Sequence, residues 1–310
     1  MADADLNVVT GAFGYTGRHI TRRLLVRGKR VKTLTGHPDR PHEFGQRVTA
    51  VPYNFDNPKA LTESLKGASV LFNTYWIRFS LKGLTFSKAV ENSRTLIKAA
   101  ENAGVRRIIH VSITNPSVDS PFPYYRGKAE VEKIITQSKM SYVILRPNVL
   151  FGDEGILINN IAWLLRRSPI FAVPGSGEYK VQPMFVQDLA DMAVNLAERD
   201  ENIVLDAVGP EIYTFNDLVK MIGEKVGTKV SLVHISPEIF LKLANIIGKL
   251  VGDVILTKEE VEGLIADLLV SNQPPTGWTA LSEWLSENNT WIGKQYMSEI
   301  KKHYSQSSQH

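Results

Sequence analysis

Short apolar blocks alternate with longer stretches of helical periodicity through the first half of the chain. Six blocks show little polar alternation, which is typical of strands that are buried on both faces of a sheet. We expect these strands at 6–9, 31–34, 48–51, 70–72, 107–111 and 142–145. Apolar residues three and four positions apart predict a helix between the first two strands and others at 58–65, 87–103, 128–138 and 188–198.

The regular alternation of strand and helix predicts an α/β fold with a doubly wound parallel sheet. After Pro147, loops with glycine and proline separate shorter elements. We therefore expect one domain over 1–150, whose sheet is completed by elements within 180–200, and a smaller mixed α/β lobe over 151–310. In that second half, four polar residues are expected to cap helices: Asp188, Thr214, Ser236 and Thr257.

Three glycines punctuate the segment that joins the first strand to the first helix. Their spacing, Gly11-x-x-Gly14-x-x-Gly17, is one residue longer than the common dinucleotide-binding pattern, but it has the same place between a strand and a helix. A helix N-terminus at such a turn offers N–H groups and a positive dipole end to an anion. A tight turn without a ligand is the alternative. The turn predicts a pyrophosphate site formed by Gly11, Phe13, Gly14, Tyr15, Thr16 and Gly17.

The residues that follow the second and later strands bear on the choice of dinucleotide. The acidic residue that binds the adenosine ribose of NAD is absent after the second strand, which ends at Thr35. Basic groups stand within reach instead, so we expect NADP to be preferred weakly over NAD. The residues expected to contact the cofactor here are Arg18, Thr35, His37, Arg40, Asp56 (at the adenine), Asn73 and Thr74.

A serine, a tyrosine and a lysine follow in an order that suits carbonyl chemistry. Ser112 follows the fifth strand, and Tyr124 and Lys128 stand four residues apart, which on a helix is one turn along the same face. A nearby ammonium lowers the pKa of a phenol from about 10 towards neutral pH, so the phenol can donate a proton to a forming alkoxide. A hydroxyl can hold the carbonyl oxygen. Ser112, Tyr124 and Lys128 are therefore candidate catalytic residues.

Together these features resemble the extended or atypical short-chain dehydrogenases/reductases, which include NAD(P)-dependent epimerases and dehydratases. The resemblance covers roughly residues 5–235 and is carried by 9–18, 105–112, 124–128, 146–152 and 184–190. It implies a Rossmann fold and places Ser112, Tyr124 and Lys128 at the family's triad, with Lys128 also bonding the nicotinamide ribose. It further implies that Asn92 matches a family asparagine and that the nicotinamide is lined by Pro147, Asn148 and Val149.

The end of the fourth strand departs from the family's usual pattern. The segment Asn73-Thr74-Tyr75-Trp76 resembles an atypical branch that includes NmrA-like redox sensors and the accessory Rossmann subunit of respiratory complex I. Many members of that branch bind a cofactor and catalyse nothing. We expect Tyr75 and Trp76 to pack in the core, although they could also shape a substrate pocket.

Two classes of function follow from these features. The first is an NAD(P)H-dependent oxidoreductase that acts on a carbonyl or hydroxyl of a small molecule through Ser112, Tyr124 and Lys128. The alternative is a non-catalytic protein that binds NAD(P)H as a redox sensor or as an accessory subunit of a membrane-associated complex. A nucleotide-sugar epimerase or dehydratase is a lesser alternative within the enzyme class.

Composition narrows the remaining possibilities. The 310 residues include no cysteine, which excludes disulfides and thiolate metal sites, and the seven histidines show no ligand spacing, so no metal is expected. The net charge is +4, but no aromatic residues interleave with the basic stretch 18–32, so no nucleic-acid partner is expected. The start of the chain lacks a secretory pattern, and we expect a cytoplasmic protein, monomeric or homodimeric.

Two segments could contact a membrane or a protein partner. The first is the basic stretch 18–32, for which a solvated helix face is the ordinary alternative. The second is the amphipathic helix predicted over 239–250, for which the alternative is a cap on the second lobe. Lys242, Lys249 and Asp253 interrupt this region, so it is too polar to span a bilayer.

Overall fold

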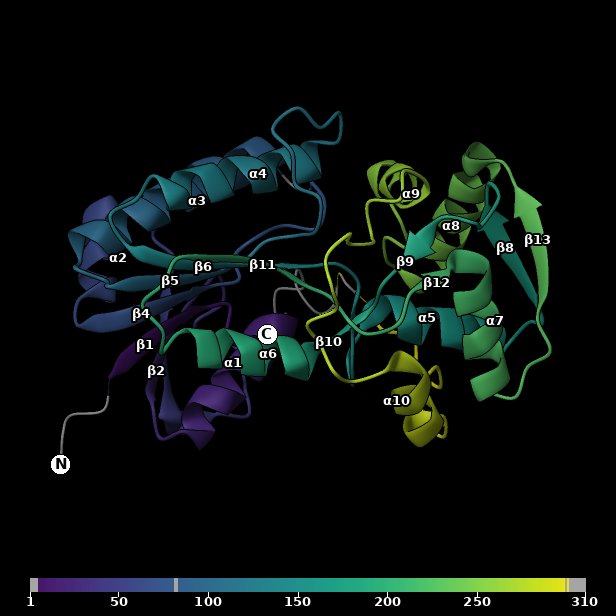
Figure 1. The fold of residues 1–310 in the computed structure, drawn as a ribbon, viewed down its shortest axis with the longest axis horizontal. Coiled ribbons are helices and arrows are strands. Elements are labelled where there is room, and N and C mark those ends of the chain that lie inside the picture. The colour runs from purple at the N-terminus through teal and green to yellow at the C-terminus, as the bar shows by residue number, and fades with distance from the viewer. Residues whose placement is uncertain (1–4, 81–82, 299, 301–310) are drawn as a thin grey trace, which may run out of the picture. The chain divides into compact units, whose positions relative to one another are not determined.

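The computed structural model describes residues 5–80, 83–298 and 300, and it divides into two compact units (Figure 1). The first unit comprises Met1–Arg146 and Leu189–Leu205, and the second comprises Pro147–Asp188 and Asp206–His310. The chain therefore leaves the first unit after its sixth strand and returns to it for one helix and one strand.

A seven-stranded sheet forms the centre of the first unit. Its strand order is β11-β6-β5-β4-β1-β2-β3, and every pairing among β1 to β6 is parallel. The direction of winding reverses between β1 and β4, which is the point where doubly wound sheets bind their ligands. The strands are β1 Leu6–Thr10, β2 Arg30–Thr35, β3 Val48–Pro52, β4 Ala68–Asn73, β5 Arg107–Val111, β6 Ser141–Pro147 and β11 Ile203–Ala207.

Helices cover both faces of this sheet, as the alternation of elements predicts. In Figure 1, α2, α3 and α4 lie over one face, and α1 and α6 lie over the other. Leu71, Ile108 and Ile144 from three adjacent strands are fully buried in the core beneath them. The helices are α1 Tyr15–Val26, α2 Pro58–Leu65, α3 Phe86–Asn102, α4 Pro123–Thr136 and α6 Val186–Leu196.

Two expectations about these elements need correction. Helix α4 begins at Pro123, five residues before the predicted start at 128, so Tyr124 and Lys128 both belong to it. Proline at the first helical position suits its fixed φ and missing N–H. The last strand of the sheet, β11, comes from Ile203–Ala207, beyond the range 180–200 in which completion was expected. Its residues are mostly half-buried or exposed, unlike those of the inner strands.

Arg107 fastens this returning segment to the sheet. Its side chain is fully buried in β5, and its Nη2 donates to the carbonyl oxygens of Leu196 at 3.2 Å and Glu201 at 2.8 Å. The amide of Tyr142 in β6 also donates to the side-chain oxygen of Asn202 at 2.9 Å. The edge of the sheet thus depends on side-chain bonds between segments about 60 to 90 residues apart.

The second unit has its own core. Phe151, Val173, Leu218 and Trp284 are among the buried side chains that form it. Three two-stranded pairs surround this core: β7 Leu150–Phe151 with β10 Met184–Phe185, β8 Ile170–Pro174 with β13 Ser231–Ile235, and β9 Lys180–Val181 with β12 Tyr213–Thr214. Its helices are α5 Ile156–Leu165, α7 Phe215–Lys225, α8 Pro237–Val251, α9 Lys258–Ile265 and α10 Leu281–Asn288.

Three of the predicted helix caps in this unit are confirmed. Thr214 accepts from the Asp217 amide, Ser236 from the Ile239 amide, and Thr257 forms a full capping box with Glu260. Asp188 does not cap α6. Its carboxylate accepts from the amides of Trp278 and Thr279 and from the Thr279 hydroxyl, so it holds a distant segment of the chain. Among the described residues, no helix is both long and apolar enough to cross a membrane.

We predict that Arg107→Ala lowers the free energy of unfolding by roughly 2–4 kcal/mol, because it opens a cavity at a fully buried side chain and removes the hydrogen bonds to the Leu196 and Glu201 carbonyls. The neighbouring Arg106 provides a matched control, since it pairs at 3.0 Å with the exposed Asp200 and its removal should change stability little. Urea unfolding of both variants tests this. Equal stability of the two variants would show that Arg107 does not hold β11 in the sheet.

Candidate functional site

The glycine turn lies at the carboxyl end of β1, beside the point where the sheet reverses direction. Gly11 adopts a φ of +67°, a conformation that side chains other than glycine rarely take, and its amide donates to the Leu34 carbonyl at 2.8 Å. Gly14 is the N-cap of α1 and supplies no side-chain cap. No N-cap side chain therefore competes with an anion for the N–H groups of the first helical turn.

Close packing explains the third glycine. A Cβ atom on Gly17 would lie 2.2 Å from the Gly11 carbonyl oxygen, so only glycine lets α1 approach the turn this closely. The buried Thr33 of β2 stabilises the turn. Its hydroxyl donates to the Val9 carbonyl at 2.8 Å and accepts from the Ala12 amide at 3.0 Å. The residues present thus form the cradle that a dinucleotide pyrophosphate requires.

The basic residues expected near the adenosine have different surroundings. Arg18 donates to the Phe13 carbonyl at 3.3 Å and lies 3.5 Å from Glu43, so its guanidinium is engaged within the loop that follows β2. The Phe13 ring stacks on His42 of the same loop at 4.0 Å. Glu43 therefore brings an acidic group to this edge, which sequence spacing did not reveal.

Other expected contacts of the adenosine end lie on the loops after β2 and β3. Thr35 is buried and its hydroxyl accepts from the His37 amide at 3.2 Å. His37 is exposed, Arg40 is half-buried, and Asp56 lies in an exposed turn. These three side chains are placed where a ligand at the carboxyl end of β2 could meet them.

Asn73 joins the carboxyl ends of three strands. Its Oδ1 accepts from the Thr10 hydroxyl at 3.2 Å and from the Tyr75 amide at 3.1 Å, and its Nδ2 lies 3.1 Å from His110 Nδ1. Thr74 adds a second link, because its amide donates to the Thr10 hydroxyl at 2.7 Å. Asn73 and Thr74, predicted as cofactor contacts, thus hold the glycine turn of β1 against β4 and β5.

Lys128 reaches into the sheet from α4. Its ammonium is almost fully buried, donates to the Val111 carbonyl at 2.8 Å, and lies 4.9 Å from the centroid of the Trp76 ring. The Val111 carbonyl directly precedes Ser112, whose buried hydroxyl has no hydrogen-bond partner among the described residues. The structure therefore brings the predicted lysine to the strand end that carries the predicted serine.

Burial governs the charge of this group and of its neighbour. Desolvation lowers the pKa of Lys128 from 10.5 to about 7, against the opposing attraction of Glu132. Desolvation, with the charge of Lys128, holds the pKa of the buried His110 well below its usual value. The His110 Nε2 has no hydrogen-bond partner among the described residues. The end of β5 thus holds two buried polar groups with spare hydrogen-bonding capacity.

An aromatic wall stands beside the lysine. The Tyr124 ring packs edge to face on Trp76 at 6.0 Å and on Phe86 at 5.8 Å. Gly127 makes room for this wall, because a Cβ there would lie 2.9 Å from the Trp76 ring. Tyr75 is buried, as expected, and its hydroxyl accepts from Asn92, the residue that the family resemblance singled out, at 2.8 Å.

Three residues expected at the nicotinamide belong to the second unit. Pro147 is the last residue of β6, Asn148 and Val149 follow it, and Asn148 Nδ2 donates to the Leu269 carbonyl of the same unit at 2.9 Å. The Val149 carbonyl accepts from the Met184 amide at 2.8 Å. These bonds give the segment a structural role within its own unit.

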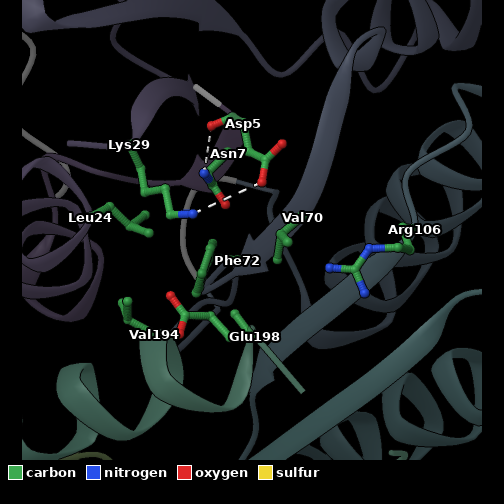
Figure 2. A pocket seen from close by; sticks show the side chains of 10 residues that line it. Asp5, Asn7, Leu24, Lys29, Val70, Phe72, Arg106, Val194 and Glu198 are labelled. Carbon is green, nitrogen blue, oxygen red and sulfur yellow. Dashed lines mark hydrogen bonds and ion pairs between the residues drawn. The ribbon is translucent and has the colours of Figure 1, made fainter. Parts of the chain in front are cut away.

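A separate cavity of about 240 Å³ opens at the opposite, amino end of the sheet (Figure 2). Leu24, Val70 and Phe72 supply its apolar side, and Lys29 points towards Asp5 at 3.9 Å. Ligands of doubly wound sheets bind at the carboxyl ends of the strands, so this cavity is not the dinucleotide site. In the described parts of the chain, no group of three or more His, Asp or Glu residues is arranged to hold a metal ion.

Comparison with known proteins agrees with this geometry. A sequence model of NAD(P)H-binding domains matches residues 11–161. The chain is 25% identical over 230 residues, 70% of its length, to subunit 9 of the mitochondrial NADH dehydrogenase [ubiquinone] 1 alpha subcomplex of Arabidopsis thaliana, and it spans 57% of that protein. It is also 26% identical over 234 residues to a ceramide reductase of Caulobacter vibrioides. That alignment covers 73% of this chain and 72% of the reductase.

A solved structure shows the same fold. An NADPH-dependent quinone oxidoreductase of Escherichia coli, in complex with NADPH, superposes with a TM-score of 0.73 at 20% identity. The superposition covers 91% of this chain and 99% of the oxidoreductase. The predicted Rossmann-type α/β fold is therefore confirmed.

We predict that Gly17→Ala weakens dinucleotide binding at least tenfold, since the added Cβ displaces α1 from the Gly11 carbonyl. Titration with NADPH and with NADH, followed by nicotinamide fluorescence, measures the loss. A thermal unfolding curve for the same variant checks that the fold persists. Unchanged affinity in a folded variant would contradict the assignment of the cradle.

A second prediction concerns the stability contributed by Lys128. Its pKa is 10.5 in the unfolded chain and about 7 in the folded one, so the unfolded state binds more protons between these values. The free energy of unfolding should therefore rise with pH in that window, by up to about 1.4 kcal/mol per pH unit from this group.

The variant Lys128→Met should lose this rise and be the more stable protein near pH 7. Lys133→Met, on the exposed side of the same helix, serves as the control. Urea unfolding at pH 7, 8, 9 and 10 separates the variants. Parallel curves for Lys128→Met and the wild type would show that burial does not lower the pKa of Lys128.

Proposed function

Because residues 11–161 match a sequence model of NAD(P)H-binding domains, we propose that this protein is an NAD(P)H-dependent reductase of a carbonyl-type substrate. The observation that carries the proposal is the buried ammonium of Lys128 at the Val111 carbonyl, next to the unpartnered hydroxyl of Ser112. Burying a charge without a full set of partners destabilises a fold, so such groups are concentrated at functional sites.

The three residues have distinct roles in this proposal. The nicotinamide supplies the hydride when it is bound. Ser112 donates a hydrogen bond to the substrate oxygen, and Tyr124 gives that oxygen its proton. Lys128, four residues after Tyr124 on α4, lowers the phenol pKa by its charge. Because the pKa of Lys128 is about 7, its amine gains or loses a proton near neutral pH.

The surroundings of Tyr124 favour an apolar substrate. Trp76 and Phe86 stack at 6.2 Å beside the Tyr124 ring, and this wall offers aromatic faces rather than charged groups. The names of two similar proteins point the same way, since one acts on ceramide and the other on quinones. A ketone or quinone on an apolar skeleton is thus the substrate class we propose.

We also propose NADPH as the preferred dinucleotide. The carboxyl end of β2 carries Thr35, and the loop after it carries His37 and Arg40, so no carboxylate at the strand end repels a 2′-phosphate. His37 and Arg40 are the basic residues of that loop that we propose for the phosphate.

The likeness to a respiratory-complex subunit favours a second candidate function. A protein that binds NAD(P)H without catalysis, as an accessory or sensing subunit of a membrane-associated complex, would use the same cradle. Such a protein would have no need of a proton donor at Tyr124. Turnover therefore separates the two candidates.

We predict that Tyr124→Phe lowers turnover of NADPH with a panel of apolar ketones and quinones by roughly 10²- to 10⁴-fold, while NADPH affinity stays unchanged. Tyr125→Phe is the matched control, because it removes the adjacent buried phenol and keeps the ring. Equal turnover in both variants would contradict the role of Tyr124. Tight NADPH binding by the wild type, with no turnover of any substrate, would favour the accessory function.

A further inference from the structure

Helix α8 of the second unit buries its small residues and exposes a row of large aliphatic ones. Its small residues Ala244 and Gly248 are buried, and a Cβ on Gly248 would lie 2.6 Å from the Asp253 carbonyl oxygen. Large aliphatic side chains stand outside instead, at spacings of four, three and four residues that place them on one face. Their exposed fractions are 51% for Ile239, 42% for Leu243, 56% for Ile246 and 81% for Leu250.

We propose that this α8 stripe, formed by Ile239, Leu243, Ile246 and Leu250, docks the protein on the surface of a membrane that contains anionic lipid. An interfacial helix lies in the plane of the bilayer with its apolar face among the lipid chains and basic residues at the headgroups. Lys242 and Lys249 supply those basic residues. They are exposed, stand two turns apart, and both lie along the same flank of the stripe.

Charge supports an anionic surface. Glu238 is the one acidic residue of α8, against two lysines, and the whole chain carries a net charge of +4 with a pI near 9.0. Cations beside an apolar stripe attract negatively charged headgroups before the aliphatic side chains insert.

Two other occupants fit the stripe less well. The longest segment outside the described residues, 301–310, follows Ile300 and reads Lys-Lys-His-Tyr-Ser-Gln-Ser-Ser-Gln-His, without one aliphatic side chain. A second copy of the chain needs about 800 Å² per partner for a stable interface. Four side chains along a helix of 15 residues, about 22 Å long, offer only a fraction of that area.

The test is co-sedimentation of the full-length protein with vesicles of phosphatidylcholine, with or without 30% phosphatidylglycerol. We expect binding that the anionic lipid strengthens and that 0.5 M salt weakens. Ile246→Ser with Leu250→Ser should reduce the partition coefficient at least tenfold. The matched control replaces Ile212 and Val26, which are 51% and 81% exposed, by serine and should bind like the wild type.

The absence of cysteine allows the contact to be located directly. A Leu250→Cys variant labelled with an environment-sensitive fluorophore should shift its emission to the blue on addition of anionic vesicles, whereas labelled Ile212→Cys should not. No vesicle binding by the wild type, or a loss caused by the control substitutions, would overturn the proposal. So would a dimer in light scattering that the α8 substitutions dissociate, because the stripe would then be an interface between copies.

Discussion

The side chain of Asn73 holds together the edge of the sheet on which the proposed chemistry depends. One amide bonds the ends of β1 and β4 through Thr10 and meets β5 at His110. Parallel strands leave their last backbone groups without partners in the next strand, and here a fully buried side chain replaces them. The glycine turn, the end of β4 and the end of β5 therefore occupy defined positions relative to one another.

That arrangement has an energetic cost concentrated at β5. His110 and Ser112 lie two residues apart on one face of the strand, and each leaves a buried polar atom without a partner. Lys128 adds a buried ammonium that donates to one carbonyl and rests on the Trp76 ring. A core that served stability alone would place apolar side chains at these positions. This cost supports the proposal that the end of β5 binds a ligand.

The fold itself does not decide between catalysis and binding. Proteins of this architecture include the NADPH-dependent quinone oxidoreductase and, by sequence likeness, a subunit of a respiratory complex. Function in such folds belongs to the few side chains at the strand ends. In this chain Lys128 donates to the Val111 carbonyl at the end of β5, beside Ser112, and the two proposed functions differ in whether Tyr124 of α4 passes a proton to a substrate.

Much of the first unit is determined by the sequence, because its information is local. Apolar blocks predict β1 to β6 within two residues at each end, and the glycine turn follows from three residues whose neighbours are adjacent in the chain. The caps at Thr214, Ser236 and Thr257 are equally local, since each bonds an amide three residues away.

Tertiary structure decided what depends on distant partners. The half-buried β11 pairs with β6, and Arg107 bonds the segment that leads into it. Asp188 bonds residues 278 and 279 instead of capping its own helix. The pKa of Lys128 follows from burial beneath Trp76, which no spacing reveals. The periodicity of α8 predicts an apolar face, but only the tertiary structure shows that this face points outward. The helix packs through the small residues Ala244 and Gly248, which allow close approach to the rest of the unit.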